Sequence, residues 1–378
     1  MVDDRPRRIL VLVPSLTAGG AERMVVNLLR ELDRSAWRPV LATFSGEVDY
    51  TDEMPADVRH FELGKSSRLG NLTVVFRLAR LIHRMQPDLI FTRIYFCGLV
   101  AFFARRLGRN CAPIVAAIDT TLSRAIRDEP LLRVRRPITA AVLSRLERVV
   151  AISGASRADL VESFGVPPEG CPMIYNGVDV CRIRELMEEP LRETEWDTEV
   201  PMFVSVGRLT RAKNYPLLIR AFARVRQTHG ARLLILGEGE ERERLERLVR
   251  DLDLEDAVSM PGFRANPFKY IRAATAFVMS SDWEGLPMVL IEAMACGAPI
   301  ISTRYETGAE ELVEHGENGL LVPRGDTEAL AGAMKRVIDD PNLRARLARG
   351  AGDRAWQFDN ARVVGKYEEV FRDALAER

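Results

Sequence analysis

The stretch DWEGLPMVLIEAMACGAP, residues 282–299, places two glutamates eight positions apart. Glu284 opens a Gly/Pro turn, and Glu292 lies in the apolar run that follows, whose pattern predicts a helix over 287–297. The free N–H groups and positive dipole end at such a helix start favour an anion or a sugar hydroxyl. The two carboxylates could therefore bind the sugar and ribose hydroxyls of a sugar nucleotide, with its diphosphate between them. Taken alone, however, the motif is better explained by a helix N-terminal acid and a salt-bridged helix glutamate.

A second stretch, SVGRLTRAKNYP at 205–216, brings two cations to the end of a predicted strand. A diphosphate is well bound by one planar guanidinium and one compact ammonium group, which Arg208 and Lys213 would supply. The chain has only five lysines among its 54 basic residues, so a lysine in this loop stands out. The alternative is that both charges are solvated loop residues.

A glycine pair occurs in PSLTAGGAER, residues 14–23. A strand ends there, Gly19 and Gly20 form a turn, and a helix begins near Ala21. Backbone can approach a phosphate closely at such a turn, and the helix start favours it. The spacing fits neither a dinucleotide fingerprint nor a Walker loop, and a plain tight turn is the better explanation of this stretch alone.

The elements that must position these residues alternate along the chain. Unbroken apolar runs, which predict buried parallel strands, are separated by helical patterns. The predicted strands cover 8–13, 38–44, 87–92, 112–118, 148–153, 201–207, 231–237, 274–281, 298–303 and 319–323. A charged, Pro-containing stretch at 180–200 interrupts the alternation and suits an interdomain connection. We therefore expect an α/β protein of two doubly wound, Rossmann-like domains that face each other across a ligand-binding cleft.

The composition is that of a soluble globular protein, with 47% apolar and 29% charged residues among 378 and zero formal net charge. Neutral charge gives no indication of nucleic-acid binding. The N-terminus lacks a signal-peptide pattern, which favours a cytoplasmic location. The longest uncharged apolar run, 94–104, is too short to span a membrane and predicts a buried helix. Residues 1–180 carry 25 basic against 20 acidic residues, which suggests either membrane contact through Arg105, Arg106, Arg109 and 133–136 or ordinary scatter.

These motifs occur together, in an order and at spacings that resemble the retaining, nucleotide-sugar-dependent glycosyltransferases of family 4, with the GT-B architecture. The resemblance spans nearly the whole chain. Besides the glutamate pair it rests on the motifs GGAE at 19–22, AISGASRADL at 151–160, YNGVD at 175–179, GRL…K…N at 207–214, LGEGEER at 236–242 and HGENGLLVPRGD at 315–326. The sequence EGLPMVLIEAMACGAPII most resembles that of the branch that transfers N-acetylhexosamine-type sugars, often onto polyprenyl-diphosphate-linked glycans.

The resemblance implies roles at the matching positions. Arg208 and Lys213 match the pair that neutralises the donor diphosphate, Glu284 the glutamate that contacts the donor sugar, and Glu292 the one that binds ribose. Arg264 would border the nucleobase. Backbone contacts to sugar and phosphate would come from three residues, Gly285, Leu286 and Pro287.

The front domain, residues 1–180, is implied to be the acceptor side. Gly20 would approach the phosphate or the acceptor, and Gly19 and Glu22 would lie on the acceptor side. Residues 190–355 would form the nucleotide-sugar-binding domain. A final helix within 356–378 would cross back to the front domain.

One position departs from the family pattern. Many members carry a histidine just after the strand that reads IVAAI here, whereas this chain has Asp119 at that place. None of the four histidines matches. Asp119 could accept a sugar hydroxyl, as a catalytic-site residue, or it could cap the next segment.

The implied reaction is retaining transfer of a sugar from a nucleotide-diphosphate-sugar, with UDP favoured, to a glycan or lipid-linked glycan. Neither a metal nor another cofactor is expected, because the cations and the helix dipole serve in place of a metal. The implied partners are the donor and the acceptor, with no nucleic acid. Two alternatives stay open: a sugar-nucleotide epimerase of the same architecture, and a non-catalytic sugar-nucleotide-binding protein.

Overall fold

The computed structural model describes residues 5–16, 20–46, 53–64, 70–128, 130–191, 200–305 and 308–377. The chain forms two compact units. Unit 1 comprises residues 1–177 and 360–378, and unit 2 comprises residues 178–359. The chain thus passes between the units at 177–178 and at 359–360, whereas the sequence placed the connection within 180–200. The start of that stretch instead forms a helix of unit 2, and residues 192–199 lie outside the described part.

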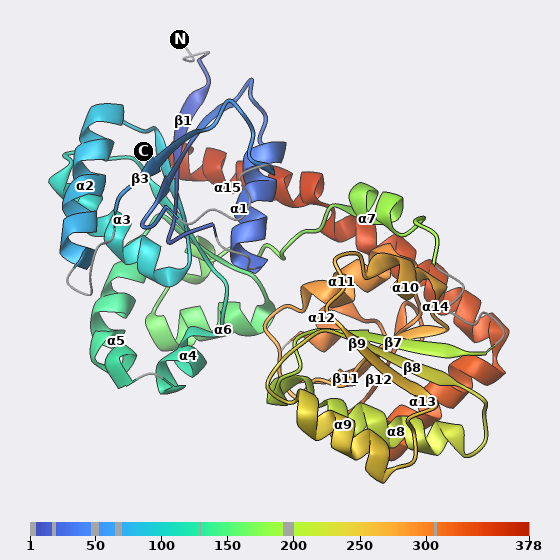
Figure 1. Ribbon diagram of the computed structural model, residues 1–378. Coiled ribbons are helices and arrows are strands. Elements are labelled where there is room, and N and C mark those ends of the chain that lie inside the picture. Colours follow the sequence, from blue (N-terminus) through green and yellow to red (C-terminus); the bar gives the residue numbers. More distant parts are fainter. Residues whose placement is uncertain are drawn as a thin grey trace. The chain divides into compact units, whose positions relative to one another are not determined.

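Unit 1 consists of a parallel sheet with helices on both faces (Figure 1). Its strands are β1 Arg7–Val13, β2 Trp37–Thr43, β3 Arg59–Glu62, β4 Leu89–Arg93, β5 Ile114–Ile118 and β6 Arg148–Ala151. Its helices are α1 Gly20–Glu31, α2 Gly70–Met85, α3 Tyr95–Leu107, α4 Leu122–Asp128, α5 Pro130–Leu143, α6 Gly154–Phe164 and α15 Asn360–Ala376.

Unit 2 repeats this design. Its strands are β7 Met202–Val206, β8 Arg232–Leu236, β9 Val258–Gly262, β10 Ala276–Met279, β11 Ile300–Arg304 and β12 Gly319–Pro323. Its helices are α7 Val180–Leu186, α8 Tyr215–Arg226, α9 Arg242–Asp251, α10 Phe268–Ala273, α11 Met288–Ala295, α12 Ala309–Leu312, α13 Thr327–Asp339 and α14 Pro341–Ala355. Short 3₁₀ turns cover Pro168–Gly170, Arg211–Lys213 and Trp356–Phe358.

Both sheets have the same strand order. It is β3-β2-β1-β4-β5-β6 in unit 1 and, read in the same sense, β9-β8-β7-β10-β11-β12 in unit 2. Described neighbours pair in parallel. In each unit the first strand lies beside the fourth, so successive connections run to opposite sides of that junction. Such a reversal opens a crevice at the carboxyl ends of the two strands, where open α/β sheets bind ligands. The predicted pair of doubly wound, Rossmann-like domains is confirmed.

The predicted strands match all the central strands and two edge strands, β6 and β12, because each contains an unbroken apolar run. Two strands were missed, and they are the corresponding edge strands β3 and β9. Strand β3 reads RHFE and is exposed along its length, whereas β9 reads VSMPG and contains a proline. Neither has the apolar pattern from which a strand is predicted, and proline is tolerated at a sheet edge.

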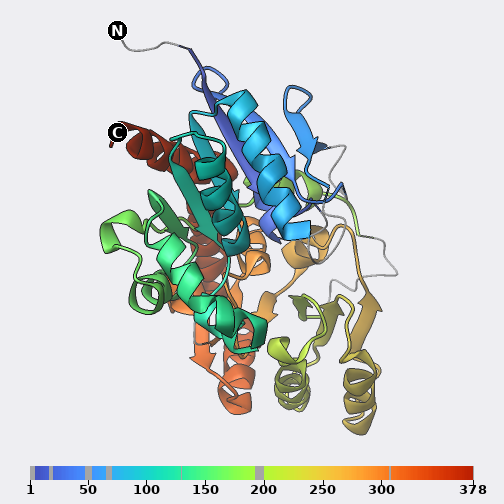
Figure 2. The same ribbon diagram turned by 90° about the vertical axis from the view of Figure 1, so that its left-hand side faces the viewer.

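The helices form a layer on each face of the sheets. In unit 1, α2 and α3 lie on one face, and α1 and α15 lie on the other (Figures 1 and 2). In unit 2, α8, α9 and α13 cover one face of the sheet, and α10 and α11 cover the other (Figure 1). Each sheet therefore buries both of its sides, and its loops at the carboxyl edge are left to form a site.

The last helix belongs to unit 1 although it follows unit 2 in sequence. Its buried residues recur every three or four positions, which gives α15 one apolar face. On that face the ring of Phe371 contacts those of Trp37 and Phe91, at centroid distances of 5.5 and 5.4 Å. Glu368 also accepts a hydrogen bond from the backbone N–H of Asp33. The α15 helix is thus part of the unit 1 core.

We predict that Phe371→Ala lowers the free energy of unfolding of unit 1 by about 3–5 kcal/mol, because a fully buried aromatic side chain is lost and a cavity remains. Urea titration followed by circular dichroism measures this change. Lys366→Ala, an exposed substitution on the same helix, should change stability by less than about 0.5 kcal/mol. Equal stability of the two variants would show that α15 does not stabilise unit 1.

Candidate active site

The candidate site in unit 2 lies at the carboxyl ends of the neighbouring strands β7 and β10. The loop after β7 contains Arg208 and Lys213, and the loop after β10 contains Glu284. The ammonium of Lys213 donates to Glu284 Oε1 at 2.7 Å, and both side chains are largely buried, with exposed fractions of 18% and 13%. Ser281 Oγ donates to the same carboxylate oxygen at 2.5 Å. Three side chains from two loops therefore meet where the strand order reverses.

The backbones of these two loops are also joined. The N–H of Asp282 donates to the carbonyl of Ala212 at 2.9 Å, and Ser280 Oγ donates to the carbonyl of Lys213 at 2.9 Å. The amide of Asn214 donates to Asp282 Oδ1 at 3.1 Å. Because these contacts hold the loop backbones, the Lys213–Glu284 pair is fixed in place rather than formed by two mobile side chains.

Two buried tyrosines border the Glu284 carboxylate. Burial raises the pKa of Tyr215 and that of Tyr305, and the negative charge of Glu284 raises both pKa values further. Both phenols are therefore neutral at physiological pH and can serve as hydrogen-bond donors.

A pocket of about 460 Å³ lies beside the ion pair, along the loops that follow β7, β8 and β9. Its charged groups come from Arg208, Arg264, Glu238 and Glu292, of which Glu238 is paired with Arg242. Phe263 and Phe268 supply aromatic surface. Arg264 donates to the carbonyl of Pro261, which holds its guanidinium at the pocket rim. A cavity with two cations, two carboxylates and two aromatic rings suits a ligand that combines phosphate, hydroxyls and a flat ring.

Two glycines of the motif LGEGEER allow this pocket to form. Gly237 has φ +140°, and a Cβ there would lie 2.0 Å from the carbonyl oxygen of Gly207. A Cβ on Gly239 would lie 2.3 Å from the carbonyl oxygen of Leu209. The loops after β7 and β8 therefore approach each other more closely than any side chain permits. This role of the two glycines could not be predicted from the motif alone.

Glu284 and Glu292 lie on either side of a helix start, as predicted, but they have different surroundings. Helix α11 begins at Met288, between them, with Pro287 at its N-cap position. Glu292 lines the pocket, whereas Glu284 pairs with Lys213. Gly285 is exposed and Leu286 is buried. Of the two predicted diphosphate-binding cations, Arg208 lines the pocket and Lys213 is held by Glu284.

The predicted acceptor-side residues lie in unit 1. Gly20 is the first residue of α1 and Glu22 lies in its first turn, following strand β1. Gly19 lies outside the described residues. Strand β1 neighbours β4, so the start of α1 is near the second reversal point of the fold.

Asp119 forms a buried ion pair that the sequence did not predict. Its Oδ1 accepts from the guanidinium of Arg93, which lies at the end of β4, next to β5. The same guanidinium nitrogen donates to Asn176 Oδ1 at 2.5 Å. Asp119 does not cap the next helix, since the N–H of Ser123 donates instead to Asp159. Burial raises the pKa of the Asp119 carboxyl, and the charge of Arg93 opposes that rise.

The segment beside Arg93 is strained. Ile94 has φ +69°, a left-handed conformation that a β-branched side chain rarely adopts. The buried Nε of Arg93 and Oδ2 of Asp119 also lack a hydrogen-bond partner among the described residues. Such features gather at functional sites more often than elsewhere. A sequence signal did exist, namely an arginine at the end of an apolar strand, but its partner could be chosen only in three dimensions.

The described residues lack two further features. They contain no group of three or more histidine, cysteine, aspartate or glutamate side chains placed to hold a metal ion. Among them, no helix combines the length and hydrophobicity needed to cross a bilayer.

We predict that Asp119→Ala lowers the free energy of unfolding of unit 1 by about 3 kcal/mol, because Arg93 would be left as a buried charge without its counterion. Asp119→Asn keeps an acceptor oxygen and should cost less. Thermal unfolding of the two variants, compared with Asp57→Ala at the exposed Arg34 ion pair, measures the difference. If Asp119→Ala melts like the wild type, the pair does not stabilise the unit.

Comparison with known proteins agrees with this arrangement. The model of the family described as glycosyltransferase family 4 matches residues 18–182, and that of glycosyl transferases group 1 matches residues 187–354. Together the two matches cover most of both units.

Individual relatives are similar over most or nearly all of the chain. The chain is 29% identical over 376 residues to a Campylobacter jejuni enzyme, N-acetylgalactosamine-N,N'-diacetylbacillosaminyl-diphospho-undecaprenol 4-alpha-N-acetylgalactosaminyltransferase, covering 98% of each chain. It is 27% identical over 312 residues to N-acetyl-alpha-D-glucosaminyl L-malate synthase of Bacillus anthracis, covering 81% of this chain and 80% of that one.

Among solved structures, the Anabaena protein HepE in complex with UDP superposes with a TM-score of 0.82 at 25% identity, covering 97% of this chain and 100% of that one. Family models, full-length relatives and architecture agree with the sheets and loops described above. The chain belongs to the family 4 glycosyltransferases of the GT-B fold.

Proposed function

We propose that this glycosyltransferase transfers an N-acetylhexosamine-type sugar from a UDP-sugar to a polyprenyl-diphosphate-linked glycan, with retention of anomeric configuration. The donor part rests on one observation above others, the pocket that combines Arg208, Arg264 and Glu292 with two aromatic rings beside the Lys213–Glu284 pair. The acceptor part draws on the Campylobacter jejuni relative, whose printed name specifies a diphospho-undecaprenol-linked acceptor.

Within this proposal each unit 2 residue has a separate task. Arg208 binds the donor diphosphate as an exposed guanidinium on the pocket wall, and Glu292 binds the ribose hydroxyls. Arg264 and Phe263 border the base. The backbone of residues 285–287 and the start of α11 add N–H groups for the sugar and phosphate.

Lys213 and Glu284 act together. Glu284 accepts hydrogen bonds from the donor sugar, and Lys213 holds that carboxylate in position while placing a positive charge beside the leaving diphosphate. As the bond to the sugar breaks, negative charge grows on the diphosphate, and the fixed positive groups stabilise it. Side chains and a helix start would thus stabilise the charge that a metal ion could otherwise stabilise. We therefore propose a metal-independent reaction with no cofactor.

Asp119, at which the chain departs from the family pattern, has a role different from the two considered from its sequence. Its carboxylate is held by Arg93. We therefore propose that Asp119 balances the buried charge of Arg93 at the carboxyl edge of unit 1, near the predicted acceptor-side residues Gly20 and Glu22, rather than binding the donor sugar.

A polyprenyl-linked acceptor resides in a membrane, so we propose that the protein acts at the cytoplasmic surface of that membrane. The reaction would belong to polysaccharide or cell-envelope biosynthesis. Unit 1 would make the peripheral contact.

We predict that UDP raises the melting temperature of unit 2 and that Arg208→Ala weakens UDP binding by about 10- to 100-fold, because a charge-assisted hydrogen bond contributes about 1.5–3 kcal/mol. Thermal-shift titration with UDP, and with GDP in parallel, measures both effects. Arg211→Ala is the matched control, since Arg211 is an exposed arginine of the same loop that does not line the pocket. Stabilisation by GDP alone would indicate that the donor carries guanosine rather than uridine. No response to either nucleotide would contradict the donor site.

We also predict that Glu284→Gln keeps UDP binding but lowers transfer to a short-chain polyprenyl-diphosphate glycan by about 100-fold, the size of effect seen when one fixed group at a reacting centre is removed. Glu310→Gln, at an exposed ion pair, should transfer like the wild type. Mass spectrometry of the acceptor measures the rate. An epimerised donor in reactions without acceptor would favour the epimerase alternative, and binding without any transfer would favour the non-catalytic one.

A further inference from the structure

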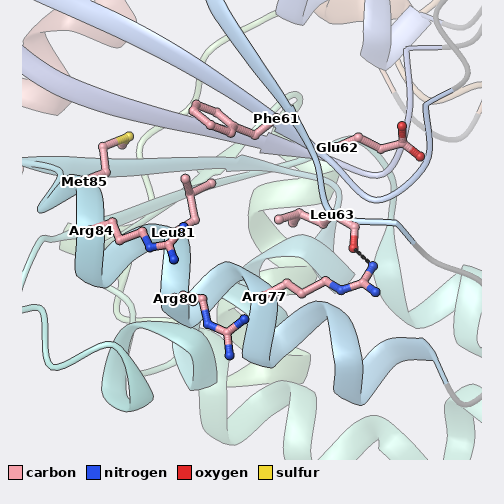
Figure 3. Close-up of a pocket in the computed structure, with 8 residues that line it drawn as sticks. All are labelled: Phe61, Glu62, Leu63, Arg77, Arg80, Leu81, Arg84 and Met85. Atoms are coloured by element: carbon pink, nitrogen blue, oxygen red, sulfur yellow. Dashed lines mark hydrogen bonds between the residues drawn. The ribbon is translucent and has the colours of Figure 1, made fainter.

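Buried polar atoms that lack a hydrogen-bond partner are rare in folded proteins, so each one needs an explanation. In unit 1, α2 and the edge strand β3 form a pocket of about 400 Å³, and its described lining residues have no such atom (Figure 3). Arg77 borders this pocket and donates to the carbonyl of Leu63 at 2.7 Å. The pocket therefore presents no buried polar group for a ligand to satisfy.

Among the described residues of unit 2, two side chains do have a buried polar atom without a partner, Arg354 and Tyr305. For Arg354 this atom is Nε alone, because its other two nitrogens donate to Gln357 and to the carbonyl of Glu311 at 2.9 Å. The hydroxyl of Tyr305 is the only polar atom of its side chain, and the residue is 5% exposed. Tyr305 is therefore a buried phenol that makes no hydrogen bond to the described residues.

Tyr305 is the first residue after strand β11, which pairs in parallel with β10. The segment that follows β11 lies beside the loop that follows β10 at two places. Thr303 Oγ1 donates to the carbonyl of Ser281 at 2.6 Å. Further along, a Cβ on Gly308 would lie 3.5 Å from the carbonyl oxygen of Gly285. The two segments therefore run side by side at the carboxyl edge of the sheet.

Tyr305 and Glu284 each lie between these two places of contact, on opposite segments. Burial raises the pKa of the Tyr305 hydroxyl, and the negative charges of Glu284 and Glu311 raise it further. The phenol is thus close enough to both carboxylates to be affected by their charge, and it stays protonated. It is a neutral hydrogen-bond donor beside the candidate site.

The strand order places Tyr305 and Lys213 on opposite sides of Glu284. Strand β10, whose loop carries Glu284, lies between β7 and β11 in the sheet. Lys213 follows β7 and donates to Glu284 Oε1 at 2.7 Å, and Ser281 donates to the same oxygen. Tyr305 follows β11. Because a carboxylate has about four acceptor positions, Glu284 can accept a further hydrogen bond from the β11 side.

We propose that Tyr305 is a positioning residue for Glu284. While the donor sugar is bound, the Tyr305 hydroxyl donates to the Glu284 carboxylate from the side opposite Lys213. Hydrogen bonds at catalytic groups are often absent or long without substrate and shorten when it binds. A carboxylate held from both sides keeps one orientation toward the sugar hydroxyls. This proposal deepens the proposed function and rests on the role given there to Glu284.

The first test is Tyr305→Phe, which removes only the hydroxyl. Because that hydroxyl has no partner in the structure, the melting temperature should equal or exceed that of the wild type. UDP affinity should be unchanged, since Tyr305 does not line the pocket. The kcat for transfer from UDP-N-acetylgalactosamine to a short-chain polyprenyl-diphosphate glycan should fall about 10-fold, because a hydrogen bond to a charged group is lost.

The matched control is Tyr270→Phe. Tyr270 is 3% exposed, belongs to α10 of the same unit, and has its ring 5.3 Å from the ammonium of Lys269. This variant should have the kcat of the wild type. A purely structural effect of removing a buried hydroxyl would lower the melting temperature, whereas the proposal lowers kcat alone.

A double-mutant cycle shows whether Tyr305 acts through Glu284. In a Glu284→Ala background, which has no carboxylate to position, Tyr305→Phe should change kcat by less than about twofold. In a Glu311→Ala background its effect should remain about 10-fold. The proposal is overturned if Tyr305→Phe transfers like the wild type or has the same effect with and without Glu284. It is also overturned if the effect disappears in the Glu311→Ala background, which would make Glu311 the partner of the phenol.

The same variants separate this proposal from the proposed function. If Glu284→Ala transfers like the wild type, the role proposed for Glu284 is wrong and the role of Tyr305 fails with it. If Glu284→Ala loses transfer and Tyr305→Phe does not, only the role of Tyr305 is rejected.

Discussion

The ion pair between Lys213 and Glu284 joins two loops that are 71 positions apart in the chain. Its partners meet because β7 and β10 are neighbours in the sheet, which places the loops after them at the same edge. The contacts of Asp282 with Ala212 and of Ser280 with Lys213 hold the two backbones together. A partly buried ammonium and carboxylate then satisfy each other, and the adjoining pocket wall carries Arg208 as a solvent-facing cation. The chemistry proposed for unit 2 depends on this single contact.

Unit 1 uses the corresponding position for a different purpose. Its β4 strand ends in Arg93, which is buried and shared between Asp119 and Asn176. Burying a guanidinium is costly unless its charge is matched, so the aspartate at 119 has a structural reason to be acidic. The strained backbone at Ile94 and the nearby polar atoms without partners show that this edge of the unit is not optimised for stability alone. The two units thus share a strand order, and each places a largely buried ion pair at the carboxyl edge of its sheet, Lys213–Glu284 in unit 2 and Arg93–Asp119 in unit 1.

The surfaces of the units differ as well. Net charge over the whole chain is zero because acidic residues elsewhere offset the arginines of helices α2, α3 and α5. The α2, α3 and α5 helices can concentrate positive charge because their inward faces are apolar and bury against one sheet face. Their outward faces, where no packing constraint applies, are then free to combine arginine with phenylalanine and leucine. A charge total cannot reveal this, since it contains no information about which helices share a face.

Sequence alone determined the alternating α/β architecture, the central strands of both sheets, the loops that carry Arg208, Lys213 and Glu284, and the helix that carries Glu292. It could do so because a strand buried on both faces must be a continuous apolar run, and because the polar residues that follow such runs lie at one edge of a parallel sheet. Tertiary structure alone decided the edge strands β3 and β9, whose exposed or proline-containing sequences carry no apolar signal. It also decided that α15 joins unit 1 and that Arg93 pairs with Asp119, 26 positions away. Such pairings depend on which strands become neighbours, and that order is set by the packing of the whole unit rather than by any local pattern.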